Sequence, residues 1–353
     1  MRVAENAPLA PLTTLRLGGN AARLVTVEGE GEVVEMVGEI DRRGERLLVV
    51  GGGSNLVIAD TGFEGTVVRM GTRGRTTVRG SDDGQLLVTA QAGEPWDDFV
   101  SAMVDEGLAG VECLSGIPGL VGAVPMQNVG AYGQDVSETI VRLRAYDRER
   151  RQVVVIEREE CAFAYRSSAF RGRDRHVILD VTFALVRSRE SRPIRYAELA
   201  RALGVLENAQ VPLAQARATV IELRRKKGMV LDPSDPDTAS AGSFFTNPIL
   251  PAAELETLRL RLGDDGPVPA FPERDGRFKV SAGWLIERAG FSKGFLGEGG
   301  RVAISSKHAL ALTNRGSATA RELVALARRI RDGVHARFGV MLENEPVFVG
   351  LAL

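Results

Sequence analysis

The chain has 353 residues, of which 44% are hydrophobic and 26% are charged, and its formal net charge is −1. This length predicts two or three domains, and the near-neutral charge argues against a nucleic-acid-binding protein. The two cysteines, Cys113 and Cys161, and the three histidines lack metal-ligand spacing, so we expect neither a metal site nor a disulfide. We find no signal-peptide core and no bilayer-spanning run, and we expect a cytoplasmic protein without a membrane partner.

The first elements end in a glycine cluster. Residues 6–19 are expected to form an extended lead-in, followed by a strand at 22–27 and a helix at 30–43. A short apolar strand at 47–50 then runs into Gly51, Gly52, Gly53, Ser54 and Asn55. Strands at 56–58 and 66–68 follow, where a Rossmann unit would place a helix. The pattern favours a phosphate-binding loop between strands, with a simple hairpin turn as the alternative.

A second glycine-rich segment carries no charge. After a strand at 85–90 and a helix at 95–106, residues 113–134 contain five glycines and two prolines and no charged side chain. Prolines and glycines at this spacing argue against a helix and favour a buried loop whose N–H groups are available as donors. Two such loops predict a large phosphate-bearing cofactor held mostly by main chain. Strands at 141–146, 152–156 and 177–186 predict a mostly antiparallel sheet.

The rest of the chain alternates helices with loops. Residues 161–170 are typical of a surface turn in which Arg166 faces water. Taken alone, Tyr196 is typical of a residue that caps the edge of a core. A helix at 213–227 precedes a linker at 231–238, where we expect a domain boundary. A loop at 241–248, a helix at 281–289, a strand at 308–313, a helix at 316–338 and an extended tail complete the chain.

Seven segments together resemble one enzyme family in order and over essentially the full chain: TTLRLGG, VVGGGSNLVIAD, LSGIPGLVGAVPMQNVGAYG, AYRSSAF, AGSFFTNP, SAGWLIERAG and LENEP. The chain is similar to the UDP-N-acetylenolpyruvoylglucosamine reductases, also called UDP-N-acetylmuramate dehydrogenases. It resembles the subclass in which a tyrosine loop covers the substrate.

The resemblance implies an α+β fold: a two-domain FAD-binding fold of the vanillyl-alcohol-oxidase-like (PCMH) type and a C-terminal substrate-binding domain. The implied domains are 1–75, to which 340–353 returns, then 76–230 and 231–339. The implied enzyme is a monomer of peptidoglycan precursor synthesis. It takes hydride from NADPH through bound FAD and reduces UDP-N-acetylglucosamine enolpyruvate to UDP-N-acetylmuramate.

The resemblance also implies site residues. Ser243 matches the proton-donating serine, Arg166 the arginine near the substrate carboxylate, and Glu345, rather than Glu343, the carboxylic residue. The implied cofactor residues are Gly51, Gly52, Gly53, Ser54, Asn55, Leu56, Ser115, Gly116, Ile117, Pro118, Gly119, Gly122, Ala123, Asn128, Gly130, Ala131 and Tyr132. The implied substrate contacts are Tyr165, Tyr196, Lys227, Asn247, Lys293 and His308.

Three positions depart from the family pattern. His308 stands where one branch has glutamine, two extra residues lie around Lys227, and Val347 stands where some members have arginine. Two other functions remain as alternatives: an FAD oxidase that uses dioxygen, and a nucleotide-sugar sensor without turnover. The oxidase would not need Ser243, Arg166 and Glu345 together.

Overall fold

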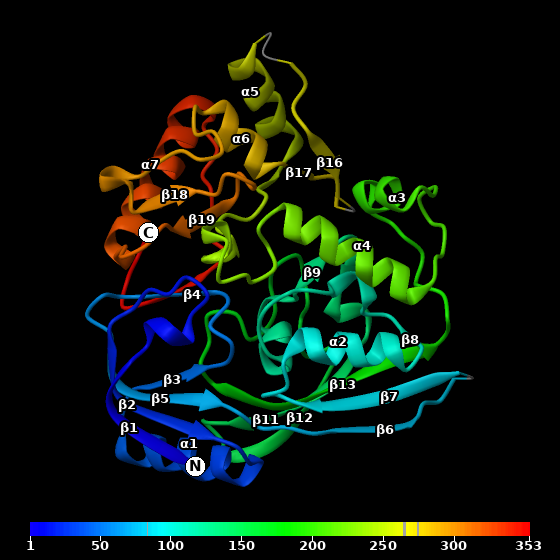
Figure 1. Cartoon of the computed structure of the whole chain (residues 1–353), viewed down its shortest axis with the longest axis vertical. Coiled ribbons are helices and arrows are strands. Elements are labelled where there is room, and N and C mark those ends of the chain that lie inside the picture. The colour runs from blue at the N-terminus through cyan, green and yellow to red at the C-terminus, as the bar shows by residue number, and fades with distance from the viewer. Residues whose placement is uncertain (83, 264–265, 274) are drawn as a thin grey trace. The chain divides into compact units, whose positions relative to one another are not determined.

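The computed structural model describes residues 1–82, 84–263, 266–273 and 275–353 (Figure 1). The chain forms two compact units. Unit 1 comprises Met1–Ala7, Ala21–Gly53 and Phe63–Val230, and unit 2 comprises Pro8–Asn20, Ser54–Gly62 and Leu231–Leu353. Among the helices of the described residues, none has the length and apolar character needed to cross a bilayer.

The first sheet of unit 1 has the strand order β1-β2-β5-β3. These strands are β1 (Arg2–Pro8), β2 (Asn20–Val27), β5 (Phe63–Met70) and β3 (Leu47–Val50). Both β2 and β3 run parallel to β5. Parallel strands need a crossover connection, and helix α1 (Glu30–Arg43) supplies the one between β2 and β3.

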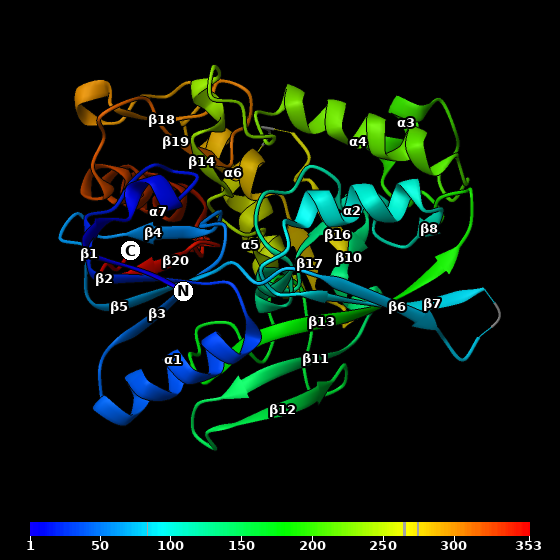
Figure 2. The ribbon, with the colours of Figure 1, turned by 60° about the horizontal axis from the view of Figure 1, so that its bottom comes forward.

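Helix α1 begins and ends where its sequence predicts. Acidic residues occupy its first turn and basic residues its last turn, which suits the helix dipole. Gly44 ends the helix in the left-handed conformation, with φ of 66°. The apolar face of α1, with Val33, Val37 and Ile40, is buried in the same core as the first sheet. Figure 2 shows the ribbon of α1 beside the strands of that sheet.

The second sheet of unit 1 is antiparallel, in the order β12-β11-β13-β7-β6, and β8 also pairs with β13. Its strands are β6 (Arg75–Arg79), β7 (Gln85–Gln91), β8 (Leu108–Ala109), β11 (Ile140–Asp147), β12 (Gln152–Glu157) and β13 (His176–Arg187). Helix α2 (Trp96–Asp105) packs on this sheet. Phe99 contacts Phe183 of β13, with ring centroids 5.0 Å apart.

Two further helices complete unit 1: α3 (Ala197–Leu203) and α4 (Leu213–Lys226). Arg217 of α4 donates two hydrogen bonds, of 2.7 and 3.0 Å, to the Asp97 carboxylate of α2. This two-point contact fixes α4 against α2. Helix α4 ends with three basic residues, which again suits the helix dipole.

Unit 2 contains three small sheets, with the orders β14-β19-β18, β15-β17-β16 and β20-β4. Its strands are β4 (Leu56–Ile58), β14 (Ser240–Ser243), β15 (Ile249–Leu250), β16 (Ala270–Pro272), β17 (Phe278–Val280), β18 (Val302–Ile304), β19 (Ala311–Asn314) and β20 (Val347–Val349). Its α-helices are α5 (Ala252–Leu262), α6 (Ala282–Arg288) and α7 (Ala320–Phe338). The buried face of α7 closes this core.

Several sequence expectations need correction at element boundaries. The last long helix begins at Ala320 rather than at residue 316, because Thr319 caps it and Glu322 completes the capping box. The strand expected at 308–313 begins at Ala311, since His308 belongs to the preceding turn. The loop expected at 241–248 starts as strand β14. Within the lead-in, residues up to Pro8 belong to β1, which the expected elements did not include.

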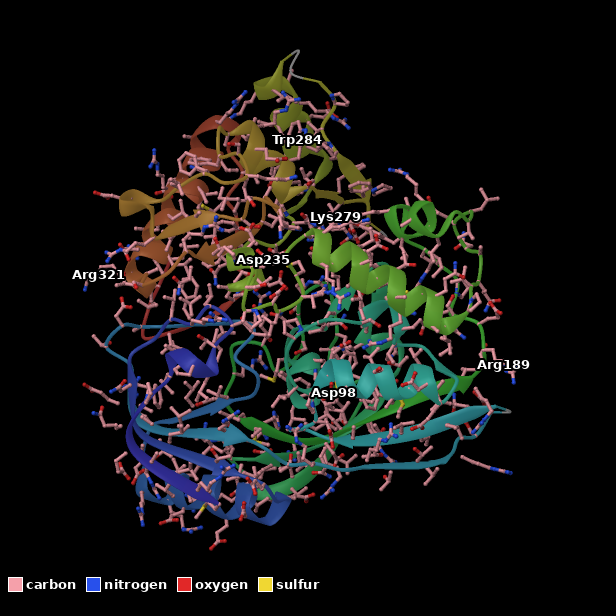
Figure 3. The ribbon with its side chains drawn as sticks, viewed as in Figure 1. Asp98, Arg189, Asp235, Lys279, Trp284 and Arg321 are labelled. Atoms are coloured by element: carbon pink, nitrogen blue, oxygen red, sulfur yellow. The ribbon has the colours of Figure 1, made fainter. Side chains whose placement is uncertain are left out.

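The segment expected to be a linker is held firmly within unit 2. Asp237 is only 4% exposed, and its carboxylate accepts hydrogen bonds from the Ser306 N–H (3.0 Å) and from Arg315 (2.8 Å). Asp235, which is labelled in Figure 3, pairs with Lys307 at 2.5 Å. The 231–238 segment is therefore held in place by hydrogen bonds and an ion pair ahead of β14, and it is not a flexible linker.

The C-terminal segment returns to a part of the first 75 residues. Strand β20 pairs in parallel with β4, from Val347↔Leu56 to Val349↔Ile58. Both strands belong to unit 2, whereas the remainder of the first expected domain is divided between the units. The division into three domains remains a prediction.

Candidate functional site

The two glycine-rich segments lie against each other in unit 1. A Cβ on Gly52 would stand 2.8 Å from the Cα of Gly119, closer than a carbon side chain can approach. A Cβ on Gly51 would make an ordinary contact of 3.4 Å with the Leu120 side chain. Glycine at 52 is therefore required because main chain meets main chain. The loop Gly51–Gly53 therefore packs directly on the 113–134 segment.

The glycine cluster is not a hairpin turn, which contradicts that alternative. Strand β3, before the cluster, pairs with β5, and strand β4, after it, pairs with β20. Residues up to Gly53 belong to unit 1, and Ser54, Asn55 and Leu56 belong to unit 2. Gly53 makes the change of direction with φ of 59°, a conformation that favours glycine.

The uncharged segment is folded around a buried acid that precedes it. The Glu112 carboxylate accepts hydrogen bonds from the Gly110 N–H (2.6 Å), the Gln134 side chain (3.0 Å) and the Arg192 N–H (2.7 Å). Sequence reasoning did not select Glu112 or Gln134. The signal was available, because Glu112 and Asp135 are the charges that bound the uncharged run.

Within this segment the expected cofactor residues differ in exposure. Ser115 is buried, and its hydroxyl donates to the Glu112 carbonyl at 2.6 Å. Ile117, Pro118 and Gly119 are partly exposed, and Ala123, in the 3-10 helix η3 (Val121–Gln127), is exposed. A Cβ on Gly122 would stand 2.5 Å from the Ala92 Cβ, so that glycine also serves internal packing.

Asn128 connects the glycine-rich segment to the segment that carries Arg166. Its side-chain amide donates to the Ala164 carbonyl at 3.1 Å, and its Oδ1 accepts from the Ser137 N–H at 3.1 Å. Asn128, Tyr132 and Arg166 all adopt positive φ, from 48° to 50°. Such backbone costs about 1–3 kcal/mol per non-glycine residue and is concentrated at functional sites.

Residues 165–166 do form a turn, closed by a bridge between Ala164 and Ser167, but the expectation that Arg166 faces water is wrong. Its Nη2 donates to the Gly130 carbonyl at 2.6 Å, and its Nη1 lies 3.7 Å from the Asp135 carboxylate. The side chain is 20% exposed, and its guanidinium lies over the Tyr165 ring at 5.3 Å from the centroid. A Cβ on Gly130 would overlap Asp135, so glycine there makes room for this arrangement. Arg166, Tyr165 and Gly130 therefore form one cluster.

Tyr132 joins two of the expected substrate residues. Its ring meets the Tyr196 ring edge to face, with centroids 5.5 Å apart, and Lys227 Nζ lies 5.6 Å from its centroid. Lys227 also pairs with Glu198 at 2.5 Å. Burial raises the pKa of Tyr132 to about 12, so its hydroxyl stays neutral near pH 7. Tyr196 is 44% exposed and precedes α3, which leaves its ring partly accessible to solvent.

In unit 2, Ser243 and Glu345 lie on neighbouring stretches of backbone. Ser243 ends β14, and the carbonyl of the next residue, Phe244, accepts a hydrogen bond of 2.9 Å from the Glu345 N–H. The Thr246 N–H donates to the Glu343 carbonyl at 3.0 Å. Asn55 joins the same stretch, since its side chain donates to the Glu345 carbonyl at 3.3 Å. Two expected catalytic residues are thus brought together with one expected cofactor residue.

Hydrogen bonds of Leu310 link the turn that carries His308 to Phe244, the residue after Ser243. His308 Nδ1 accepts a hydrogen bond from the Leu310 N–H at 3.1 Å. The Leu310 carbonyl in turn accepts from the Phe244 N–H at 2.7 Å. Because Nδ1 is an acceptor, a neutral His308 carries its proton on Nε2.

The Asn247 side chain makes a hydrogen bond within the fold, whereas Lys293 is exposed to solvent. The Asn247 Oδ1 accepts from the Ala282 N–H at 2.9 Å, at the start of α6. Lys293 is exposed, and the following Gly294 N–H donates to the Ile304 and Ser305 carbonyls, both at 3.2 Å. The Lys293 turn therefore runs beside the segment that leads to His308.

The described residues contain no group of three or more histidine, cysteine or acidic side chains able to hold a metal ion. An organic anion fits better, because unit 1 places a buried arginine, Arg224, beside the glycine-rich segment. The Nε of Arg224 has no hydrogen-bond partner among the described residues. A phosphate-bearing cofactor such as FAD would supply negative charge to this segment.

Comparison with known proteins gives the same picture. A family model described as "FAD binding domain" matches residues 21–155. A second, described as "UDP-N-acetylenolpyruvoylglucosamine reductase, C-terminal domain", matches residues 233–349. Together they span most of the chain. The chain is therefore an FAD-containing oxidoreductase with an FAD-binding domain and a C-terminal α+β domain.

Curated relatives extend the match to the whole length. The chain is 57% identical over 354 residues to the UDP-N-acetylenolpyruvoylglucosamine reductase of Thermobifida fusca, covering 99% of each protein. It is 55% identical over 355 residues to that of Streptomyces coelicolor, covering 99% of this chain and 91% of the relative. A solved structure of such a reductase from Thermus caldophilus has a similar fold, with a TM-score of 0.66, 24% identity and 99% coverage of each chain. The chain belongs to the UDP-N-acetylenolpyruvoylglucosamine reductase family.

Proposed function

We propose that the chain reduces UDP-N-acetylglucosamine enolpyruvate to UDP-N-acetylmuramate, a step of peptidoglycan precursor synthesis, with NADPH as the electron source. Bound FAD supplies the hydride chemistry. The proposed substrates are soluble nucleotides, so we assign the activity to the cytoplasm, and we propose that the monomer is active. The observation that carries the proposal is the backbone pairing of the Ser243 and Glu345 segments within unit 2.

The residue types suit this reaction. Reduction at C3 of an enolpyruvyl group places electrons on C2 and its carboxylate, which gives an enolate. We propose that Arg166 binds that carboxylate, because a guanidinium forms two parallel hydrogen bonds with a carboxylate. Gly130 and Asp135 would orient the guanidinium, given their distances of 2.6 and 3.7 Å from it.

Ser243 is the proposed proton donor to C2, and Glu345 its acidic neighbour. A serine hydroxyl is a weak acid, so its position must compensate. Strand pairing between Ser243 and Ala311 of β19 restricts its backbone. Glu345 would assist in its protonated form, because an ionised carboxylate repels an enolate.

The remaining substrate contacts are proposed for the nucleotide and the sugar. Tyr196 and Lys227, which meet around Tyr132, are suited to the diphosphate, as a hydroxyl donor and a cation. Asn247, Lys293, His308 and Tyr165 are proposed as further contacts. His308 would act through its Nε2–H donor, because Nδ1 is occupied by Leu310.

An anaerobic titration tests the proposed function. NADPH should bleach the flavin band of the purified protein, and subsequent addition of the enolpyruvyl substrate should restore it. Turnover with dioxygen and an alcohol instead would identify an oxidase. Substrate binding without flavin reoxidation would identify a sensor and contradict the proposal.

A further inference from the structure

Glu112 is a buried acid to which the proposed reaction gives no role. The residue is fully buried, and both oxygens of its carboxylate accept hydrogen bonds. Oε2 accepts from the Gly110 N–H at 2.6 Å. Oε1 accepts from the Gln134 side chain at 3.0 Å and from the Arg192 N–H at 2.7 Å. Two segments that are distant in sequence therefore meet at one oxygen atom, Oε1.

Gln134 follows the turn of a short hairpin within the uncharged segment. Strand β9 (Gly130–Ala131) pairs antiparallel with β10 (Gln134–Asp135), so Tyr132 and Gly133 form the two-residue turn. Both have positive φ, 48° and 81°, as a type I′ hairpin turn requires. This conformation is unfavourable for a bulky side chain, so the surrounding structure must hold Tyr132 in place.

The turn of this hairpin lies against the segment that carries Tyr196. The ring of Tyr132 meets the Tyr196 ring with centroids 5.5 Å apart. A Cβ on Gly133 would stand 3.3 Å from the Arg195 Cβ and 3.5 Å from the Tyr196 nitrogen. The position of the Tyr196 ring therefore depends on how the hairpin and the 192–196 segment are held together.

Glu112 supplies the buried part of that connection. The Ser191 and Ile194 N–H groups donate to carbonyls of residues 211 and 209, which hold the segment to the chain that follows it. The Arg192 N–H instead holds the segment to the hairpin, because Glu112 also accepts from Gln134. All three neighbours of the carboxylate are N–H donors, a pattern that suits a group with two accepting oxygens.

We propose that Glu112 is a positioning residue for Tyr196. It fixes the hairpin that presents Tyr132 and the segment that presents Tyr196 in one arrangement, and so sets where the Tyr196 hydroxyl meets the substrate. This inference rests on the proposed function, in which Tyr196 contacts the sugar nucleotide. Glu112 itself touches neither substrate nor cofactor in this account.

Glu112→Gln in the full-length, FAD-loaded enzyme tests the proposal. A glutamine offers one accepting oxygen in place of two, so at least one of the three donors loses its acceptor. KM for the enolpyruvyl substrate should rise roughly threefold to tenfold, the effect of losing one hydrogen bond. Because Tyr196 is distant from the reacting carbon in this account, kcat should change much less. The flavin-to-protein absorbance ratio should be unchanged.

Arg192→Pro removes the other half of the same contact. Proline has no N–H, and the Arg192 side chain is exposed, so the buried carboxylate keeps its other two contacts. The same rise in KM is expected, and this variant gives the comparison if Glu112→Gln does not fold. Arg195→Ala is the matched control on the same segment. It removes an exposed ion pair with Glu138, at 2.7 Å, and should leave KM nearly unchanged.

Double variants show whether Glu112 acts through Tyr196. In a Tyr196→Phe background the hydroxyl is already absent, so neither Glu112→Gln nor Arg192→Pro should raise KM much further. Fully multiplicative effects on KM would overturn the proposal, because Glu112 would then act elsewhere. Unchanged KM in both single variants would also overturn it, as would loss of flavin at an unchanged KM.

Hydrogen exchange separates failure of this inference from failure of the proposed function. A normal KM in Tyr196→Phe would contradict the proposed substrate contact of Tyr196, whatever Glu112 does. The anchoring role of Glu112 is measured independently by exchange of the 189–196 backbone amides in the holoenzyme. Faster exchange there in Glu112→Gln, with unchanged exchange in β13, supports the role, and equal exchange in the variant and the parent overturns it.

Discussion

The backbone N–H of Glu345 donates a 2.9 Å hydrogen bond to the carbonyl of Phe244, the residue after Ser243. Residues a hundred positions apart are thereby held in fixed register. An isolated bridge between Phe245 and Asn344 continues the same pairing. The proposed proton donor and its acidic neighbour are therefore positioned by main chain, which does not depend on their side chains.

Gly52→Ala should weaken FAD retention. The added Cβ would stand 2.8 Å from the Gly119 Cα, so the two glycine-rich segments must separate, at a cost of about 1–3 kcal/mol. The measurement is the ratio of flavin to protein absorbance after gel filtration, together with the melting temperature. Gly51→Ala is the matched control, since its Cβ would make only a 3.4 Å contact with Leu120. Equal flavin content in both variants would show that the contact does not shape the site.

Tyr196→Phe should raise KM for the sugar nucleotide roughly tenfold and change kcat much less, because one hydrogen bond to a charged group is lost. The ring packing on Tyr132 survives this substitution, so the fold should be unaffected. Steady-state kinetics with NADPH in excess measures both constants. A variant with normal KM and reduced kcat would place Tyr196 at the reacting carbon instead.

Asp147 should make stability depend on acid pH. Its buried carboxylate accepts from Arg175 (2.6 Å) and from the Glu149 and Arg150 N–H groups (3.0 and 3.1 Å). Hydrogen bonding from Arg175 holds the pKa of Asp147 far below its ordinary value. The resulting stabilisation is complete above the unfolded pKa, near 4, and is lost as the pH falls towards the folded value.

Asp147→Asn should therefore lower the free energy of unfolding by about 2 kcal/mol at pH 7, and the difference from the parent chain should shrink below about pH 4. Denaturant titrations at several pH values measure it. Asp174→Asn is the control, because that side chain is 87% exposed and should contribute little. A difference that grows on acidification would contradict the assignment.

The elements predicted most accurately from the sequence are those whose ends are marked by nearby residues, such as capping glycines and charged end turns. Helix α1 was predicted at its observed bounds, because its acidic start and basic end lie within it and Gly44 follows directly as its cap. Strand β6 was missed because all five of its residues are exposed, which leaves no burial pattern to detect. The 308–313 strand was placed too early because a side-chain contact from His308 shapes the turn.

The candidate site was predicted only through the resemblance. From the residues alone, Arg166 belonged to a surface turn. Its actual position depends on the positive φ of Asn128 and on hydrogen bonds across 36 residues of chain. Arg224 is one of the three basic residues that end α4, and no local pattern shows that its Nε is buried without a hydrogen-bond partner among the residues that the structure describes. Such features arise from tertiary packing.

The half-reactions of Ser243→Ala test the central claim most directly. Reduction of the flavin by NADPH should keep nearly its normal rate, because that step needs no proton at C2. Reoxidation by the enolpyruvyl substrate should slow by roughly 10²–10⁴, the usual range for loss of a positioned general acid. Ser243→Cys should recover part of that rate, since a thiol can also donate a proton.

Ser240→Ala, on the same strand, should leave both steps intact and so controls for disturbance of β14. The measurement is anaerobic stopped-flow absorbance of the flavin band, with each half-reaction followed separately. The account predicts a Ser243→Ala enzyme that is reduced normally and reoxidised slowly. A variant that is slow with NADPH but normal with the enolpyruvyl substrate would contradict it.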